Sequence, residues 1–376
     1  MVPDHPAYLD ALADAIVSRA VSEQATGNTA AQLEDLQTAR QLYSQLKQAL
    51  PDVPRYTEAH AITLTDIGLV QFHAERVADS LSSLLVAKQQ LTNLVNYYPL
   101  VASFRLHLAA AFDGLAQVYL EQATNLDAIE SGSTAYRLYE ELANEAAVKS
   151  DRTQITKYIE RAAVVLSHVA RARVATGEND AALIEFEKAR EYLEQLSADS
   201  PHIPDYRNEL AYVLFYLGAA EFQQDRAKAE SHCAAALLLW TELAEQTQAA
   251  EYAAQVAWFH LNCPVAEITN LQVAVDAAAK ATRLAPANPR FLIYLAEAQI
   301  LAGLQDESKR TLERVRVLGD ETSASYLCVV ARIRLADQDK DGAQLALQAA
   351  KQWTKNNRPG NFELQLKLAK LAEFLK

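Results

Sequence analysis

Residues 169–189, VARARVATGENDAALIEFEKA, carry the pattern that decides the fold. The small residue of the Val169-Ala170 pair is followed, at distances of 12, 16 and 19 residues, by Ala182, Phe186 and Ala189. Steps of four and three residues return to one face of a helix, so the last three positions form a single stripe. The stretch therefore predicts two helices that approach each other closely through small side chains.

The same offsets occur at three other places, which makes the pattern specific. Those copies begin at Ile67-Gly68, Leu295-Ala296 and Val330-Ala331. Their later positions are Ser80, Leu84 and Ala87, then Ser308, Leu312 and Val315, and finally Ala343, Leu347 and Ala350. One helix pair cannot bury its stripe alone, so consecutive pairs must stack on one another.

This skeleton resembles the tetratricopeptide repeat, in which two antiparallel helices touch through small residues. The resemblance implies an all-α fold, a right-handed α–α superhelix of antiparallel helix pairs. Scarce Gly (10) and Pro (11) residues fit the same fold class. An aromatic residue opens each unit, and the anchors are Tyr8, Tyr56, Phe104, Tyr158, Tyr206, Tyr252, Phe291 and Tyr326. We expect these aromatic side chains to pack between consecutive pairs.

The spacing of the anchors changes along the chain. Four spacings are 46–48 residues and the last is 35, against about 34 in the usual unit. The extra residues amount to two further turns, or about 10 Å, in each helix. Pro51, Pro99, Pro201 and Pro286 are expected to end helices and begin units.

These observations predict four regions. We expect about five long helix pairs over 1–250, an irregular repeat or joint over 251–285, standard repeats over 286–352 and a capping helix over 353–376. Within them we expect an interruption over 124–133, a helix over 274–281 that follows the break at Pro264, and a last helix over 362–375.

Four segments show a more specific resemblance than the general repeat pattern does. AWFHLNCP (257–264), AVDAAAKATRLAPANP (274–289), LAGLQDESKRTLERV (301–315) and KQWTKNNRPGNFELQLKLAKLAEFL (351–375) are similar to the carboxy-terminal repeat region of many bacterial serine/threonine kinases. The resemblance implies a regulatory or sensory interaction region. The glycine-rich loop, the His-Arg-Asp triplet and the Asp-Phe-Gly triplet of a kinase are not present in the 376 residues.

No other pattern predicts chemistry. The sequence has no phosphate-binding loop, no GxSxG and no HExxH, and its eight histidines form no metal-ligand spacing. We therefore expect no enzyme activity, no cofactor and no metal. The single cysteines Cys233, Cys263 and Cys328 are expected to be buried core residues. A net charge of −13 disfavours nucleic acid as a partner.

The opening segment, 1–6, lacks a signal-peptide pattern, and no stretch is apolar enough to span a membrane. We expect a cytoplasmic chain, with the extracytoplasmic region of a membrane-anchored kinase as the alternative.

In repeat arrays the first helices line the concave side, where peptides or partner helices bind. The residues predicted to face this groove are Thr65, His73, Asp113, Gln117, Arg171, Tyr212, Trp258, Glu297 and Arg332. A protein-interaction module is the preferred function. The alternatives are a self-assembling scaffold (a homo-oligomer), for which Phe362, Leu366, Leu368 and Leu371 would have to form an uncovered apolar face, and an all-α enzyme.

Overall fold

The computed structural model describes residues 5–26, 28–74 and 76–375. Residues 1–4, part of the opening segment that lacks a signal-peptide pattern, lie outside these ranges. Seventeen α-helices and one short 3-10 helix (η1, Ala266–Ile268) account for most of the described chain. The α-helices are α1 (Pro6–Thr26), α2 (Thr29–Ala49), α3 (Pro54–His73), α4 (Val77–Tyr97), α5 (Ala102–Glu121), α6 (Asn125–Val148), α7 (Arg152–Thr176), α8 (Asn179–Asp199), α9 (Pro204–Glu221), α10 (Arg226–Gln246), α11 (Ala250–Asn262), α12 (Leu271–Leu284), α13 (Pro289–Leu301), α14 (Gln305–Val317), α15 (Ala324–Ala336), α16 (Lys340–Asn357) and α17 (Phe362–Phe374).

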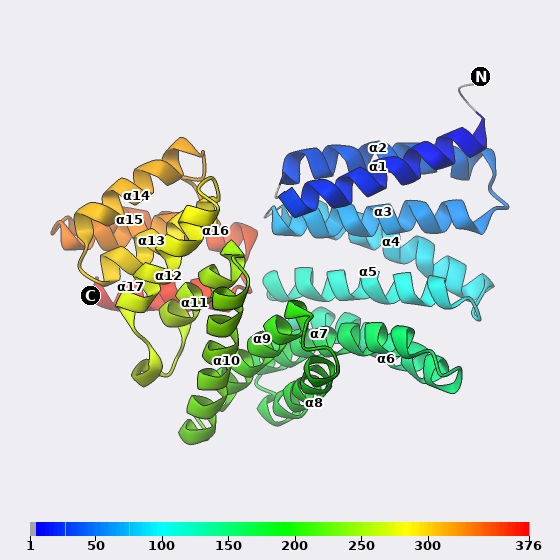
Figure 1. Cartoon of the computed structure of the whole chain (residues 1–376). Helices are drawn as coiled ribbons and strands as arrows, with labels where there is room; N and C mark the ends of the chain where they lie inside the picture. Colours follow the sequence, from blue (N-terminus) through cyan, green and yellow to red (C-terminus); the bar gives the residue numbers. More distant parts are fainter. Residues whose placement is uncertain (1–4, 27, 75, 376) are drawn as a thin grey trace. The chain divides into compact units, whose positions relative to one another are not determined.

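The helices pack in the order in which they follow one another along the chain. They form two compact units, unit 1 (Met1–Ala172) and unit 2 (Arg173–Lys376). In unit 1 helix α1 packs on α2, α3 on α4 and α5 on α6 (Figure 1). The first helices of neighbouring pairs also touch, as α3 and α5 do in unit 1 and α13 and α15 in unit 2. The all-α, tetratricopeptide-like fold of stacked helix pairs is confirmed.

Prolines mark the boundaries between pairs. Pro51, Pro99, Pro201 and Pro286 all lie in the short loops that follow a second helix. A second proline then starts the next helix, because a fixed φ suits the first helical turn and the missing N–H is not needed there. This second proline is the first residue of three helices, at Pro54, Pro204 and Pro289.

The predicted small positions are the places where paired helices meet. A Cβ added to Gly68 on α3 would lie 2.7 Å from Leu84 Cγ on α4. The hydroxyl at the position 12 residues later adds a hydrogen bond to this close approach. Ser80 Oγ donates to the Gly68 carbonyl at 2.7 Å, and Ser308 Oγ donates to the Ala296 carbonyl at 2.8 Å.

The interruption expected over 124–133 is wrong. Helix α6 starts at Asn125 and continues through Gly132 to Val148. The spacing between the anchors Phe104 and Tyr158 is 54 residues because α6 and α7 have 24 and 25 residues. Gly132 is needed inside the helix since a Cβ there would lie 2.5 Å from Val169 Cγ2.

Helix α11 ends before Pro264, as predicted, but the next helix is longer than expected. It runs over Leu271–Leu284 because the side chain of Asn270 accepts from the backbone N–H groups of Gln272 and Val273. The predicted last helix is present as α17, where Leu368 and Leu371 are buried against α15 and α16. Leu366 is partly exposed, and the side chain of Phe362 is outside the described part. The division of the chain into repeat classes stays a prediction.

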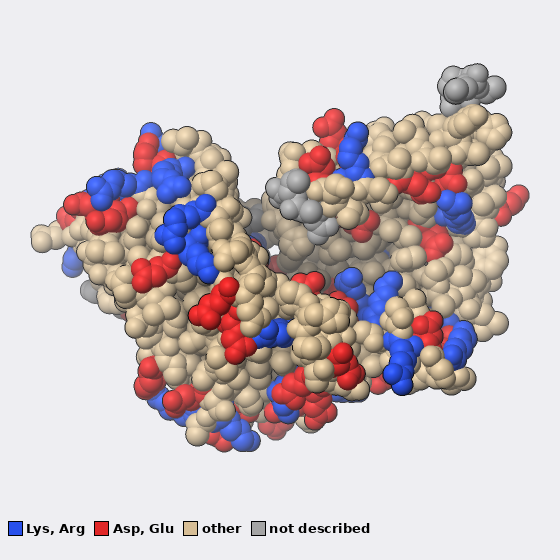
Figure 2. All heavy atoms as spheres, viewed as in Figure 1, with Lys and Arg blue, Asp and Glu red and all other residues tan. Residues whose placement is uncertain are grey.

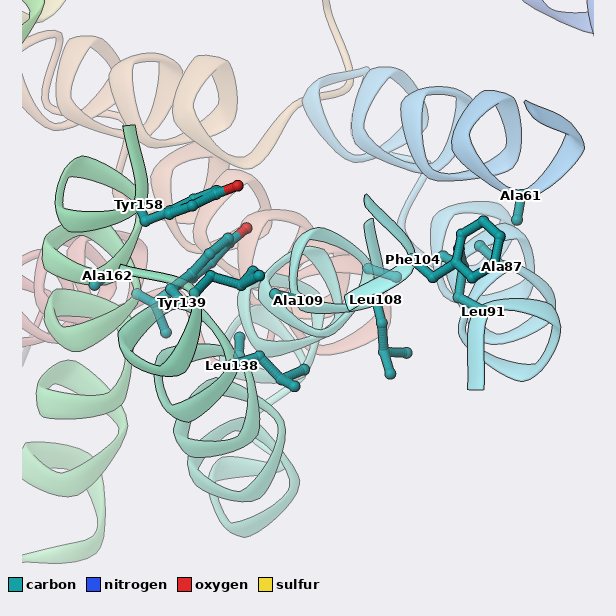
Figure 3. Packing of buried hydrophobic residues seen from close by; sticks show 14 of the residues in the cluster. Ala61, Ala87, Leu91, Phe104, Leu108, Ala109, Leu138, Tyr139, Tyr158 and Ala162 are labelled. Carbon is teal, nitrogen blue, oxygen red and sulfur yellow. The ribbon is translucent and has the colours of Figure 1, made fainter. Parts of the chain in front are cut away.

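The opening aromatic residues belong to the core in most pairs. Tyr56, Phe104, Tyr158, Tyr206 and Phe291 are buried. Tyr252 and Tyr326 are partly exposed, and Tyr8 on α1 is exposed. Figure 3 shows Tyr158 of α7 beside Tyr139 of α6, with Leu108 and Ala109 of α5 nearby in the same core cluster. The three cysteines are free and buried, as predicted.

Replacing Ala343 with leucine is expected to destabilise unit 2 by about 1–3 kcal/mol, because Ala343 is fully buried where α16 meets α15 and extra methylenes overpack the contact. The matched control is Ala349→Leu, an exposed position on the same helix, which should change stability by less than about 0.5 kcal/mol. Urea denaturation measures both changes. Equal losses in the two variants would show that the register of α16 is wrong.

Candidate binding surface on the first helices

In unit 1 the first helices of consecutive pairs carry one accessible stripe each. On α3 and α7 the accessible positions recur every three or four residues, and on α5 they are spaced by four, three and seven, so each set lies on a single face of its helix. We call these stripes together the first-helix face. It comprises Arg55, Glu58, Ile62, Asp66, Leu69 and His73 on α3, Ser103, His107, Ala110 and Gln117 on α5, and Lys157, Arg161, Val164, His168 and Arg171 on α7.

Two histidine–carboxylate pairs join these helices. Nδ1 of His107 on α5 lies 2.9 Å from Oε1 of Glu58 on α3. Nδ1 of His168 on α7 lies 3.0 Å from Oδ1 of Asp113 on α5. Burial acts to raise the pKa of Glu58, but hydrogen bonds from His107 and Ser103 outweigh it and leave the pKa below its ordinary value. These carboxylates therefore already have partners.

Asp66 differs from the carboxylates Glu58 and Asp113. It is partly exposed on the stripe of α3, and no hydrogen bond or ion pair links it to any other described residue. Burial raises the pKa of Asp66 to about 6, and nearby His107 opposes this only in part. A carboxyl group that lacks a partner in a recessed position is the kind of group that binding sites use.

Unit 2 contains a buried ion pair. Lys367 Nζ on α17 donates to Glu297 Oε2 on α13 at 2.7 Å, and the two side chains are 9% and 3% exposed. Burial raises the pKa of the Cys328 thiol on α15 to about 12; the nearby Glu297 acts in the same direction and Lys367 in the opposite one. The pair ties the last helix of the chain to the first helix of an earlier pair.

Aromatic side chains form a second feature of unit 2. Trp258 of α11 lies 4.5 Å from Phe215 of α9 and 5.8 Å from Trp240 of α10, measured between ring centroids. Tyr212 on α9 lies 6.1 Å from Trp258 and is partly exposed. Burial raises the pKa of Tyr212 well above its ordinary value. This cluster is a packed core that reaches the surface at Tyr212.

The structure places the nine predicted groove residues in two kinds of position. His73, Gln117, Arg171, Tyr212 and Arg332 are partly or fully exposed, and the buried ones are Thr65, Asp113, Trp258 and Glu297. It brings together Asp113 with Gln117, at 3.4 Å between Oδ1 and Nε2, and Tyr212 with Trp258. Thr65 donates to the carbonyl of Ala61 on its own helix. Whether these residues bind a partner stays a prediction.

Sequence reasoning missed Asp66, His168 and Lys367 as site residues, although the repeat contains a signal for them. Asp66 directly precedes the Ile67-Gly68 pair, and His168 directly precedes Val169-Ala170, so they occupy equivalent positions. Glu297, Arg332 and Lys367 are spaced by 35 residues, which is the local repeat length. A comparison of charged residues at equivalent positions would have found Lys367.

Charges of both signs are intermixed over the visible surface in Figure 2, with no large patch of one sign. The described residues contain no group of three or more His, Cys, Asp or Glu side chains that could hold a metal ion. Among the described helices none is long and apolar enough to cross a membrane.

The stacked helix pairs define an all-α helical-repeat fold of the kind seen in tetratricopeptide repeats. No protein-family model and no curated protein sequence matches the chain. Similar solved structures include the Rap conjugation gene regulator of the plasmid pLS20 in complex with the Phr* peptide, at 15% identity over 98% of both chains and a TM-score of 0.47. Aspartyl phosphate phosphatase F from Bacillus subtilis is 15% identical over 83% of this chain and 75% of its own, with a TM-score of 0.48. A tetratricopeptide repeat protein from Parabacteroides merdae is 12% identical over 96% and 98%, with a TM-score of 0.37.

Proposed function

We propose that this chain is a non-catalytic protein-interaction module that binds an extended peptide or a partner helix on the first-helix face. The observation that carries the proposal is the continuity of that face. Accessible stripes on α3, α5 and α7 follow one another, and polar pairs fix their spacing at Glu58–His107 and Asp113–His168.

The face offers what a peptide ligand needs. Ile62, Leu69 and Val164 supply accessible apolar contacts, while Gln117 and Arg161 supply hydrogen-bond donors. A peptide laid across several helices can use both kinds of contact without a deep pocket. The helices beneath are held by a common core, so the face is ordered before the ligand arrives.

We further propose that the module is cytoplasmic and that it regulates a bacterial serine/threonine kinase. The four segments quoted from residues 257–375 support this context. Sequencing the coding region on either side of this chain tests it, since an adjoining kinase domain in the same reading frame is the expected result. Neighbouring reading frames without a kinase domain would remove that part of the proposal.

The binding proposal is tested by selecting random 12-residue peptides on the immobilised chain. Ala110 lies in the middle of the stripe of α5 and is partly exposed, so Ala110→Trp fills the face without adding charge. The control is Leu126→Trp, at a position 74% exposed on α6 in the other layer of helices. We expect selected peptides to bind the parent chain and the control alike, and Ala110→Trp at least tenfold more weakly.

Failure to select any peptide would contradict the proposal. Equal binding by both tryptophan variants would place the ligand elsewhere on the chain. Concentration-dependent self-association of the chain, measured by analytical ultracentrifugation, would favour the scaffold alternative instead.

A further inference from the structure

Asp66 stands out among the carboxylates of α3 and α5. Glu58 is bonded to His107, and Asp113 is bonded to His168 and Gln117. Asp66 has no such partner in the part of the chain that the structure describes. His107 acts on Asp66 only electrostatically and is already hydrogen-bonded to Glu58.

The surroundings of Asp66 favour a cationic partner. One turn away on the same stripe lie Ile62 and Leu69, whose apolar side chains exclude part of the water around the carboxyl group. Arg55, on the same helix, is held by Asp10 and Asp14 of α1. A cation brought by a ligand therefore breaks no existing ion pair when it reaches Asp66.

We propose that Asp66 recognises a lysine or arginine side chain of the peptide bound on the first-helix face. This inference rests on the proposed function and adds the chemical class of the ligand. The pairing is a charge-assisted hydrogen bond in a partly desolvated position, which is stronger than an exposed ion pair. The equivalent position on α7 is His168, so the same contact is not repeated along the face, and the position of the cation fixes the register of the peptide.

The test uses the peptides selected on the full chain. We expect them to share a lysine or arginine at one position, flanked by apolar residues that match Ile62 and Leu69. The dissociation constant of one such peptide is then measured with the parent chain and with Asp66→Asn. The loss expected for Asp66→Asn is about 10- to 100-fold.

Two comparisons make the result specific. Glu130→Gln removes one negative charge from an exposed position on α6 and should change the dissociation constant less than twofold. A peptide with norleucine in place of its lysine should bind the parent chain as weakly as the lysine peptide binds Asp66→Asn. Combining both changes should cost little more than either alone, because they remove the same contact.

The outcomes separate the two proposals. Peptides that bind without a shared cation, or that bind Asp66→Asn as tightly as the parent chain, overturn the role of Asp66 and leave the interaction module standing. No selectable peptide at all overturns both. Circular dichroism of Asp66→Asn confirms that any loss of binding comes from a folded protein.

Discussion

Replacing Lys367 with methionine is expected to lower the free energy of unfolding of unit 2 by about 3–5 kcal/mol. Methionine has a similar length and no charge, so the packing of α17 is largely kept. The loss comes from Glu297, whose side chain is 3% exposed and would keep a buried carboxylate without its partner. All three tryptophans lie in Arg173–Lys376, so tryptophan fluorescence during urea denaturation reports on this unit.

Two variants test whether the unpaired Glu297 causes the loss of stability in Lys367→Met. Adding Glu297→Leu to Lys367→Met removes the stranded charge, and we expect most of the lost stability to return. Lys309→Met breaks an exposed pair with Asp337, whose side chains are 42% and 40% exposed, and should cost less than about 1 kcal/mol. A similar small loss for Lys367→Met and Lys309→Met would contradict the buried ion pair.

The small residues made the fold predictable, because backbone approach leaves a direct trace in the sequence. Gly68 and Ala296 occupy the same position of the repeat, and each lies against the second helix of its pair. The error at 124–133 arose because the spacing of 54 residues between Phe104 and Tyr158 was assigned to an interruption, whereas the longer helices α6 and α7 produce it. Gly132 lies inside α6, where its missing Cβ makes room for Val169, which lies 37 residues further along the chain.

The candidate site was much less predictable. An aspartate on the polar side of a helix looks like any solvated residue, and nothing next to Asp66 in sequence shows that it has no partner. Its isolation depends on His107, from another helix, being bonded to Glu58. Lys367 could have been recognised from its repeat position, but its burial depends on how α17 packs against α15.

Asp66→Asn is expected to stabilise unit 1 at neutral pH by about 2–3 kcal/mol, which is the opposite of its expected effect on binding. The pKa of Asp66 is about 6 in the folded protein, against about 3.9 in an unfolded chain. The folded state therefore holds the proton to higher pH than the unfolded state does. Each unit of difference corresponds to about 1.36 kcal/mol.

The sign of the pH dependence follows from the protons bound. Between about pH 4 and pH 6 the folded state binds more protons at Asp66, so stability falls as the pH rises through this window. Above about pH 6 the unpaired carboxylate lowers the free energy of unfolding by its full amount, and below about pH 4 this loss disappears. Asparagine cannot ionise, so the stability gained by Asp66→Asn should be near zero below pH 4 and greatest above pH 6.

Far-UV circular dichroism during urea denaturation, repeated from pH 3.5 to 7.5, measures the difference between Asp66→Asn and the parent chain. Tryptophan fluorescence in the same samples follows unit 2 and should show no change between them. A difference that is constant with pH would mean that the carboxyl group of Asp66 is ionised normally. A variant that is more stable at pH 7.5 yet binds a cationic peptide more weakly would show that Asp66 lowers the stability of the free protein and is used in recognition.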